Sequence, residues 1–236
     1  MATVLSRITV LKRAALDLLF PRWCLGCGKE GDFICGDCRR DLPVIAPPVC
    51  LRCGRPLTHS AACHDWPDTP DGIDGIRSPF AFEGVIRRAV HELKYRNLRA
   101  LVPLLSGMLY GYLVANPLPA DVLVPVPLHP KRLRERGYNQ SALLAEELGR
   151  LCVLPVAANG LLRRHYTGPQ ARSAGISERQ KNVAGAFACS DERFRGQRVL
   201  LIDDVSTSGA TLNACAGALK AAGATQVWGL TVAREL

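Results

Sequence analysis

The chain has 236 residues, of which 48% are hydrophobic and 22% are charged. This balance excludes intrinsically disordered and collagen-like chains, and the length is sufficient to bury a core without disulfide bonds. The net charge of +9 is concentrated in residues 71–236, which carry 21 Lys and Arg against 14 Asp and Glu. A basic region of this kind favours an anionic ligand, either the phosphates of a small molecule or a nucleic-acid backbone.

Residues 1–20 are predicted to form an amphipathic helix. The stretch from Val4 to Phe20 is apolar, but Arg7, Lys12, Arg13 and Asp17 interrupt it and no small-residue cleavage site follows. This pattern does not fit a signal peptide. No run in the chain approaches 18 uncharged apolar residues, so we expect no stable membrane insertion and a cytoplasmic protein.

Seven of the ten cysteines lie between Cys24 and Cys63, and without a secretory signal such a cluster indicates metal binding rather than disulfides. We therefore expect a zinc-ribbon module over residues 21–70. The first four cysteines form two C-x2-C pairs, which give the closed tetrahedral thiolate set of a structural zinc site. They are Cys24, Cys27, Cys35 and Cys38. The isolated Cys152, Cys189 and Cys215 are expected to be small buried hydrophobic residues.

A second set of cysteines, Cys50, Cys53 and Cys63, lacks a fourth member, because the position three residues after Cys63 is Trp66. Imidazole and carboxylate groups also bind zinc, so a nearby side chain could complete a second site. The candidates are His59, His64 and Asp65. The alternative is that packing alone holds this segment. Residues Pro67–Gly75, rich in acids, proline and glycine, are predicted to be a linker.

From Ile76 onward, apolar runs alternate with amphipathic stretches. The pattern predicts helices over Val85–Tyr95, Leu98–Val114, Asn139–Cys152 and Ala210–Ala222. It predicts strands over Asp121–Pro127, Arg198–Asp203 and Gln226–Ala233. We therefore expect an α/β domain over residues 76–236, with a parallel sheet covered by helices on both faces. In such folds, ligands bind beyond the carboxyl ends of the strands.

The most informative loop follows the strand that ends at Asp203 and Asp204. A turn from Ser206 to Thr211, with Gly209 inside it, leads into the next helix. Backbone N–H groups and hydroxyls at a helix N-terminus can bind one phosphate, and glycine permits a close approach of the main chain. Adjacent carboxylates suit sugar hydroxyls or a metal, so the combination predicts a ribose 5-phosphate site. The alternative, an ordinary capped helix, explains one Ser or Thr but not the whole series.

These residues resemble a known family. Ile202–Thr211 resembles the phosphoribosyl-pyrophosphate (PRPP) motif of type I phosphoribosyltransferases. The whole chain from Cys24 onward resembles the ComF family, in which a double zinc ribbon precedes a phosphoribosyltransferase domain. The other matching segments are Leu93-Lys94-Tyr95, Val124–Leu128, Arg136–Gln140, and Thr167, Gln170 and Arg179 followed by Asn182–Phe187. The resemblance implies a Rossmann-like parallel sheet of the type I phosphoribosyltransferase kind, preceded by a small zinc-ribbon module; Trp66 departs from the family pattern.

The resemblance also implies a reaction, the displacement of diphosphate from PRPP, with Mg²⁺ screening the diphosphate. The acceptor of the phosphoribosyl group is not identified. The zinc module is the candidate for the separate segment, called the hood in this enzyme class, that forms the pocket for the acceptor. Asp203 and Asp204 are expected to contact the ribose hydroxyls, and Arg179 to act at the reacting centre. The 5-phosphate is expected to bind Ser206, Thr207, Ser208, Gly209, Ala210 and Thr211. Lys94, Arg136 and Asn139 are expected to contact the diphosphate, although plain surface exposure is an equal alternative for Lys94.

Two basic segments have alternative interpretations. Lys131, Arg132 and Arg134 either help to bind diphosphate or form a solvated helix face. The loop Arg163–Lys181 either closes over the site or is a disordered surface loop. If it closes, its basic residues Arg163, Arg164, Arg179 and Lys181 could meet the diphosphate, while Gln170 and Asn182 orient it. His91 and His165 are expected to be structural or solvated.

The competing functional hypothesis is a non-catalytic protein of the same fold that binds single-stranded DNA during DNA uptake. The family's association with competence favours it, whereas the aromatic content of 6% offers few rings on which bases can stack. A helicase-like role is excluded because the chain has no G-x4-G-K-[ST] loop.

Overall fold

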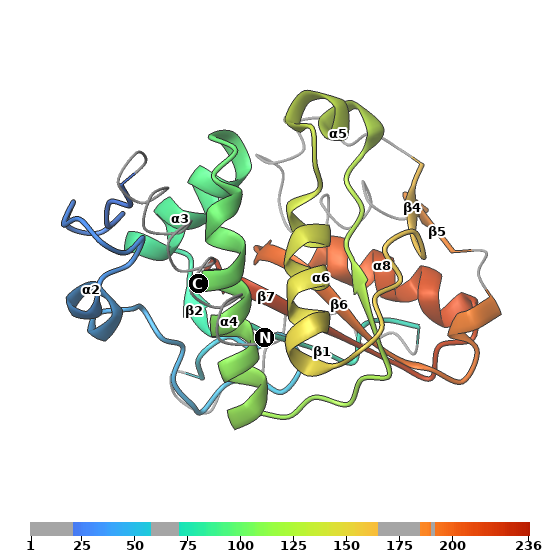
Figure 1. The fold of residues 1–236 in the computed structure, drawn as a ribbon. Helices are drawn as coiled ribbons and strands as arrows, with labels where there is room; N and C mark the ends of the chain where they lie inside the picture. Colours follow the sequence, from blue (N-terminus) through green and yellow to red (C-terminus); the bar gives the residue numbers. More distant parts are fainter. Residues whose placement is uncertain (1–20, 58–70, 165–184, 190–191) are drawn as a thin grey trace, which may run out of the picture.

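The computed structural model describes residues 21–57, 71–164, 185–189 and 192–236 (Figure 1). The predicted N-terminal helix, Cys63, Trp66 and most of the Arg163–Lys181 loop lie outside these described residues. Within the described part of the chain, no helix is both long enough and apolar enough to span a membrane.

The described residues form a five-stranded parallel sheet in the order β1-β7-β6-β3, with β2 also paired to β7. Its strands are β1 (Gly75–Arg77), β2 (Phe80–Ala81), β3 (Val122–Pro125), β6 (Arg198–Ser206) and β7 (Gln226–Arg234). The predicted parallel sheet is confirmed. However, β6 continues three residues beyond the predicted end at Asp203, so its last residues enter the candidate phosphate loop.

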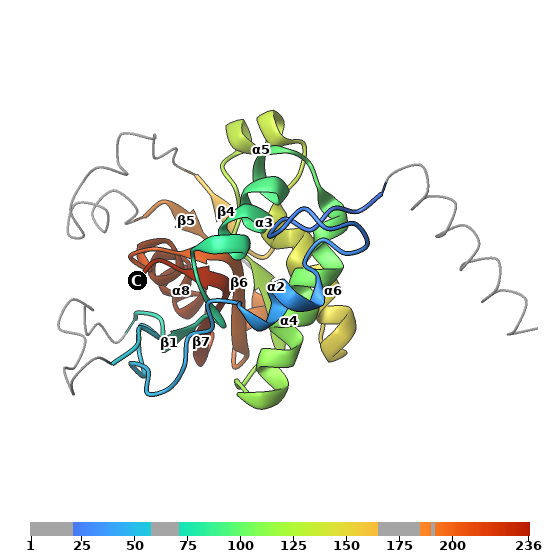
Figure 2. The ribbon, with the colours of Figure 1, turned by 90° about the vertical axis from the view of Figure 1, so that its left-hand side faces the viewer.

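Helices cover both faces of the sheet, as predicted. Alternate residues of β6 face opposite sides: Leu200 and Ile202 pack with the helices of one face, and Val199 and Leu201 pack with the helix of the other. The first face holds α3 (Gly84–Tyr95), α4 (Val102–Ala115) and α6 (Gln140–Cys152), and the second holds α8 (Ala210–Ala221). Figure 2 shows α4 and α6 on one side of β6 and α8 on the other. A strand buried on both faces has a continuous apolar sequence, which is why the strand pattern was readable.

Shorter elements complete the described fold. The helix α2 (Gly36–Arg40) belongs to the cysteine-rich segment, and α5 (Pro130–Arg136) follows β3. The 3₁₀ turns are η1 (Arg99–Leu101) and η3 (Glu192–Phe194). The strands β4 (Leu162–Arg163) and β5 (Phe187–Ala188) pair antiparallel, so that they flank the Arg163–Lys181 loop at its two ends.

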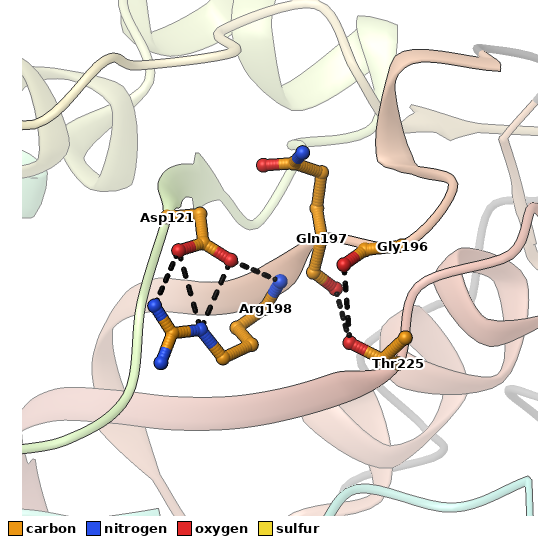
Figure 3. Close-up of polar contacts among 5 residues, drawn as sticks. All are labelled: Asp121, Gly196, Gln197, Arg198 and Thr225. Carbon is orange, nitrogen blue, oxygen red and sulfur yellow. Dashed lines mark hydrogen bonds and ion pairs between the residues drawn. The ribbon is translucent and has the colours of Figure 1, made fainter.

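Polar contacts fix the start of β6, at the amino ends of the strands (Figure 3). The Asp121 carboxylate accepts hydrogen bonds from Arg198 Nη2 at 2.5 Å and Arg198 Nε at 3.0 Å, and also from the Arg198 backbone N–H at 2.8 Å. On the other side of the strand, the Thr225 hydroxyl donates to the Gln197 carbonyl at 3.1 Å. These contacts align β3, β6 and β7 at one end, and the opposite, carboxyl end carries the candidate site.

Backbone hydrogen bonds attach the cysteine-rich segment to the edge of the sheet. Ile76 N–H donates to the Arg52 carbonyl at 2.7 Å, and Ala81 N–H donates to the Pro43 carbonyl at 2.8 Å. The last residues of the predicted linker also belong to the fold, which corrects that prediction. Asp74 accepts hydrogen bonds from Val227 N–H at 2.6 Å and from Lys220 Nζ at 3.0 Å.

Candidate functional site

The first four cysteines form a metal site. The Sγ atoms of Cys24, Cys27, Cys35 and Cys38 all lie within 4.8 Å of one another. Burial raises the pKa of Cys24, but hydrogen bonds from neighbouring backbone N–H groups outweigh it and lower that pKa to about 6. A hydrogen bond with Cys24, followed by burial, raises the pKa of Cys38 to about 12. Stabilisation of a thiolate by N–H groups in a four-thiol cluster fits a closed structural zinc site.

The second C-x2-C turn repeats the backbone geometry of the first. Gly28 N–H donates to the Cys24 carbonyl at 2.8 Å, and Gly54 N–H donates to the Cys50 carbonyl at 2.9 Å. Both glycines have left-handed φ angles, +77° at Gly28 and +73° at Gly54. Cys50 and Cys53 therefore lie on a turn with the same backbone hydrogen bond and left-handed glycine as the turn of Cys24 and Cys27. Their predicted partners Cys63, His59, His64 and Asp65 lie outside the described residues, so the second zinc stays a prediction.

The two acids at the end of β6 occupy different environments. Asp204 is buried and its Oδ1 forms an ion pair with Lys94 Nζ at 2.8 Å. Asp203 is half-buried, and its Oδ1 accepts hydrogen bonds from Ser141 Oγ at 2.8 Å and from Asp204 N–H at 2.9 Å. Burial and then repulsion by Asp204 raise the pKa of Asp203 to about 7. The structure therefore separates two residues to which the sequence assigned one role.

Lys94 lies beside the acids rather than on the open surface. Its side chain is 21% exposed, which rules out the alternative of plain surface exposure. Ser141, which contacts Asp203, was missed by the sequence analysis. Its only signal was its position, directly after the Arg136–Gln140 motif and in the first turn of α6.

The turn after β6 leads into α8 through a left-handed glycine. Gly209 has φ +74° and ψ −2° and stands directly before α8. The Ser208 hydroxyl accepts a hydrogen bond from Ala210 N–H at 3.4 Å. Ser206 is buried, and its hydroxyl has no hydrogen-bond partner among the described residues. The predicted set Ser206, Thr207, Ser208, Gly209, Ala210 and Thr211 thus joins the end of β6 to the N-terminus of α8.

The two motifs Leu93-Lys94-Tyr95 and Arg136–Gln140 contact each other. The Tyr138 hydroxyl donates to the Leu93 carbonyl, and the Arg136 guanidinium lies 5.4 Å from the centre of the Tyr95 ring. Arg136 also donates to the Gln140 side chain. Asn139 Nδ2 donates to the Val126 carbonyl at 3.0 Å, and its Oδ1 accepts from Ser141 N–H at 3.0 Å, which caps α6. Arg136 thus contacts α3 and Asn139 caps α6, and their predicted contact with diphosphate stays a prediction.

Basic side chains gather around His129, before α5. Burial, followed by the positive charges of four neighbours, lowers the pKa of His129. These neighbours are Arg163 of β4 and Arg134, Arg132 and Lys131 of α5. The segment after β3 is thus a basic helix, and the charge of Arg163 in β4 acts on the same histidine. Next to Arg163, Arg164 N–H donates to the Ala186 carbonyl at 2.8 Å. Arg179, Lys181, Gln170, Asn182 and His165 lie outside the described residues.

Comparisons with known proteins agree with these features. Residues 15–66 match the double zinc ribbon domain model. The chain is 40% identical over 114 residues to competence protein F of Haemophilus influenzae, a match that covers 47% of this chain and 49% of that relative, or about half of its length. It is 29% identical over 202 residues to competence protein ComFC of Bacillus subtilis, covering 81% of this chain and 79% of the relative. It is 30% identical over 204 residues to DNA utilization protein YhgH of Salmonella typhi, covering 83% of this chain and 88% of the relative. The chain belongs to the ComF family.

Solved structures overlap with parts of this ComF-family chain. The glutamine PRPP amidotransferase of Bacillus subtilis, complexed with ADP and GMP, has a TM-score of 0.38 and 23% identity, and covers 56% of this chain and 26% of that one. The protein TT1426 from Thermus thermophilus has a TM-score of 0.33 and 16% identity, and the match covers 55% of this chain and 72% of that one.

The ComF assignment confirms the resemblance on which the site was predicted. The parallel α/β sheet and the four-cysteine zinc site of the N-terminal segment are both present. At the carboxyl end of β6, the fold brings together Lys94 from α3, Ser141 from α6 and the two acids. Arg179 falls outside the described residues, so its predicted place at the reacting centre stays a prediction.

Proposed function

We propose that this ComF-family protein binds PRPP at the carboxyl end of β6 and transfers its phosphoribosyl group with release of diphosphate. One observation carries the proposal: the half-buried carboxyl of Asp203 is followed by a hydroxyl-rich turn that opens α8 through the left-handed Gly209. Asp203 can accept hydrogen bonds from sugar hydroxyls, and the helix N-terminus at Gly209, six residues later, can bind a phosphate. The two groups therefore match the two ends of a ribose 5-phosphate.

The residues have distinct tasks under this proposal. The N–H groups and hydroxyls of Ser206–Thr211 hold the 5-phosphate, with the positive end of the α8 dipole directed at it. The Asp203 carboxylate accepts hydrogen bonds from ribose hydroxyls and so orients the anomeric carbon. The cations of α5 and Arg163 attract the diphosphate, which enters with Mg²⁺ as part of the substrate. Positioning and charge stabilisation support displacement through a transition state with oxocarbenium character.

Calorimetric titration with PRPP and Mg²⁺, followed by an assay of diphosphate release with candidate bases, tests the proposal. We expect saturable binding that the substitution Asp203→Asn weakens by about tenfold or more, as for loss of a charge-assisted hydrogen bond. Asp74→Asn, at the opposite end of β7, is the matched control and should leave binding unchanged. Failure of the unaltered, zinc-loaded protein to bind PRPP or ribose 5-phosphate would overturn the proposal. Binding without diphosphate release would overturn its catalytic part.

The second candidate is a non-catalytic protein that binds single-stranded DNA, and two observations favour it. The cations around His129 form a basic surface that suits phosphates. The Tyr95 ring is 57% exposed beneath the Arg136 guanidinium, which suits stacking of a base. Two relatives are named for competence and one for DNA utilization. Binding of an oligonucleotide across a salt series, with Tyr95→Ala compared against Tyr110→Ala, separates this candidate from the first.

A further inference from the structure

A buried arginine connects the cysteine-rich segment to the strand beside the candidate phosphate loop. Arg234 is the last residue of β7, and it is 1% exposed. A guanidinium is stable in such surroundings only when its N–H groups reach acceptors. One acceptor is the backbone carbonyl of Cys53, to which Arg234 Nη1 donates. The side chain therefore extends from the sheet to the second C-x2-C turn.

Hydrogen bonds hold this turn from several sides. Each of the four carbonyls of Cys50–Cys53 accepts one. Their donors, in the order of the carbonyls, are Gly54 N–H at 2.9 Å, Arg77 Nη1 at 2.9 Å, Ile76 N–H at 2.7 Å and Arg234 Nη1. All of these donors except Gly54 belong to strands of the sheet. The turn is therefore a fixed support for the Arg234 side chain.

The backbone of Arg234 lies beside the start of the phosphate loop. In the register of the sheet, Arg234 is paired with Ser206, which is the last residue of β6 and the first of the predicted phosphate-binding set. Glu235 N–H donates to the Ser206 carbonyl at 3.0 Å, and the Arg234 carbonyl accepts from Phe82 N–H at 2.7 Å. The position of Ser206 therefore depends on the end of β7.

We infer that Arg234 is a positioning residue for the phosphate loop, because it holds the end of β7 on the Cys53 carbonyl and so fixes the start of Ser206–Thr211. The inference rests on the proposed function for the ligand, and it gives the second C-x2-C turn a role that needs no contact with that ligand. Groups that bind a ligand must be held within about 0.5 Å of the productive geometry. Loss of the Arg234 anchor should therefore loosen the loop and weaken phosphate binding.

Arg77 offers a matched control. It donates to the Leu51 carbonyl of the same turn, and its guanidinium lies 5.0 Å from the centre of the Trp228 ring. However, Arg77 belongs to β1, which pairs with β7 at Trp228, Gly229 and Leu230, before the end of that strand. Loss of the Arg77 side chain should therefore destabilise the docked turn without freeing Ser206.

The experiment measures the loop with and without a ligand, on the full, zinc-loaded chain. Arg234→Met removes the guanidinium and should raise hydrogen–deuterium exchange in ligand-free peptides that cover residues 205–212. In calorimetry, ribose 5-phosphate should bind this variant about tenfold more weakly, as for the loss of about one hydrogen bond. Arg234→Lys keeps a charged donor and should restore the affinity to within about threefold of the unaltered protein. Arg77→Met should lower the melting temperature but leave the loop exchange unchanged and the affinity within about twofold.

A second pair of variants approaches the same contact from the turn and leaves Arg234 in place. A Cβ atom at Gly54 would lie 2.4 Å from the Ile76 carbonyl oxygen, so Gly54→Ala should move the Cys53 carbonyl away from Arg234. That variant should also raise exchange in the loop. Gly28→Ala, in the first C-x2-C turn, should not, because a Cβ atom there meets nothing within 4 Å.

Two results would overturn the inference alone: equal effects of Arg234→Met and Arg77→Met on loop exchange and affinity, or equal loop exchange in Gly54→Ala and Gly28→Ala. The first pair of variants would then report only a general loss of stability. If the unaltered protein fails to bind ribose 5-phosphate while Arg234→Met still raises exchange in the loop, the proposed function is overturned and the positioning role stands.

Discussion

The hydroxyl group of Tyr138 donates a hydrogen bond to the backbone carbonyl of Leu93. Both residues are buried, and they belong to different sequence motifs, one at the end of α3 and one just before α6. The bond fixes the last turn of α3, from which Lys94 reaches Asp204. Tyr138 of one motif therefore affects the candidate site through the backbone of Leu93, which belongs to the other motif.

The substitution Tyr138→Phe should lower the free energy of unfolding by about 1–2 kcal/mol, because it removes one hydrogen bond and leaves a buried carbonyl without that donor. Urea denaturation of the full chain measures the change. Tyr110→Phe is the matched control, since the Tyr110 side chain lies at the surface of α4, and its effect should be within about 0.5 kcal/mol. Equal midpoints for the two variants would contradict the role assigned to this bond.

The long elements of the fold could be predicted from the sequence, and the short ones could not. β6 and β7 are buried on both faces, and α8 carries a run of alanine and leucine, so their patterns are strong. β1 and β2 have three and two residues and pair only at the edge of the sheet. Segments that short carry no periodicity, and pairing with β7 and the cysteine-rich segment creates them.

The candidate site shows a similar limit. The sequence placed Lys94, Arg136 and Asn139 at the site, and the structure puts Lys94 against Asp204. However, motif membership does not show which atoms meet. The Asn139 side chain caps α6 with its amide oxygen and holds the Val126 carbonyl with its amide nitrogen. The Arg136 guanidinium lies over the Tyr95 ring. Such contacts join residues far apart in the chain, so they become visible only in the folded protein.

Zinc retention tests the four-cysteine site. Protein purified without chelator should contain at least one equivalent of zinc per chain by elemental analysis, because four thiolates bind the ion tightly. The substitution Cys35→Ser should remove that equivalent, whereas Cys152→Ser, in the last turn of α6, should retain it. Less than half an equivalent in the unaltered protein would count against the site. Two equivalents would establish the second site despite Trp66.

The two C-x2-C turns permit a matched test of how the cysteine-rich segment docks on the sheet. Gly28 and Gly54 share a left-handed backbone, but a Cβ atom at Gly28 would point into open space, while one at Gly54 would overlap the Ile76 carbonyl oxygen. Gly28→Ala should cost about 1 kcal/mol from backbone strain alone. Gly54→Ala should cost about 1–3 kcal/mol more, because the turn must move away from β1. Equal losses in urea denaturation would show that the docked arrangement does not persist in solution.

The contact between Asp121 and Arg198 predicts a pH dependence of stability. Hydrogen bonds from the Arg198 side chain and then from its backbone lower the pKa of Asp121 to about 2. A carboxyl whose pKa is lower in the folded state stabilises the protein above its unfolded pKa, near 3.8, and this contribution is lost as the pH falls toward 2. Asp121→Asn should therefore lower the melting temperature at neutral pH and lower it less near pH 3. Glu147→Gln, which removes an exposed ion pair within α6, is the control and should have a smaller effect. A parallel pH profile for Asp121→Asn and the unaltered protein would refute the assignment.

The phosphate loop yields the last prediction, because its backbone rather than its hydroxyls should dominate binding. Gly209 adopts φ +74°, where a β-branched residue is strongly disfavoured, and it stands where the main chain must approach the phosphate. Gly209→Val should therefore abolish measurable binding of ribose 5-phosphate, while Thr211→Ala should weaken it only about fivefold, as for one hydrogen bond. Gly196→Val separates strain from site loss, since Gly196 has a similar φ of +77° but lies at the amino end of β6. That variant should lower the melting temperature and keep the affinity. If Gly209→Val stays folded and binds ribose 5-phosphate as the unaltered protein does, the turn is only a helix cap and the phosphoribosyl site must lie elsewhere.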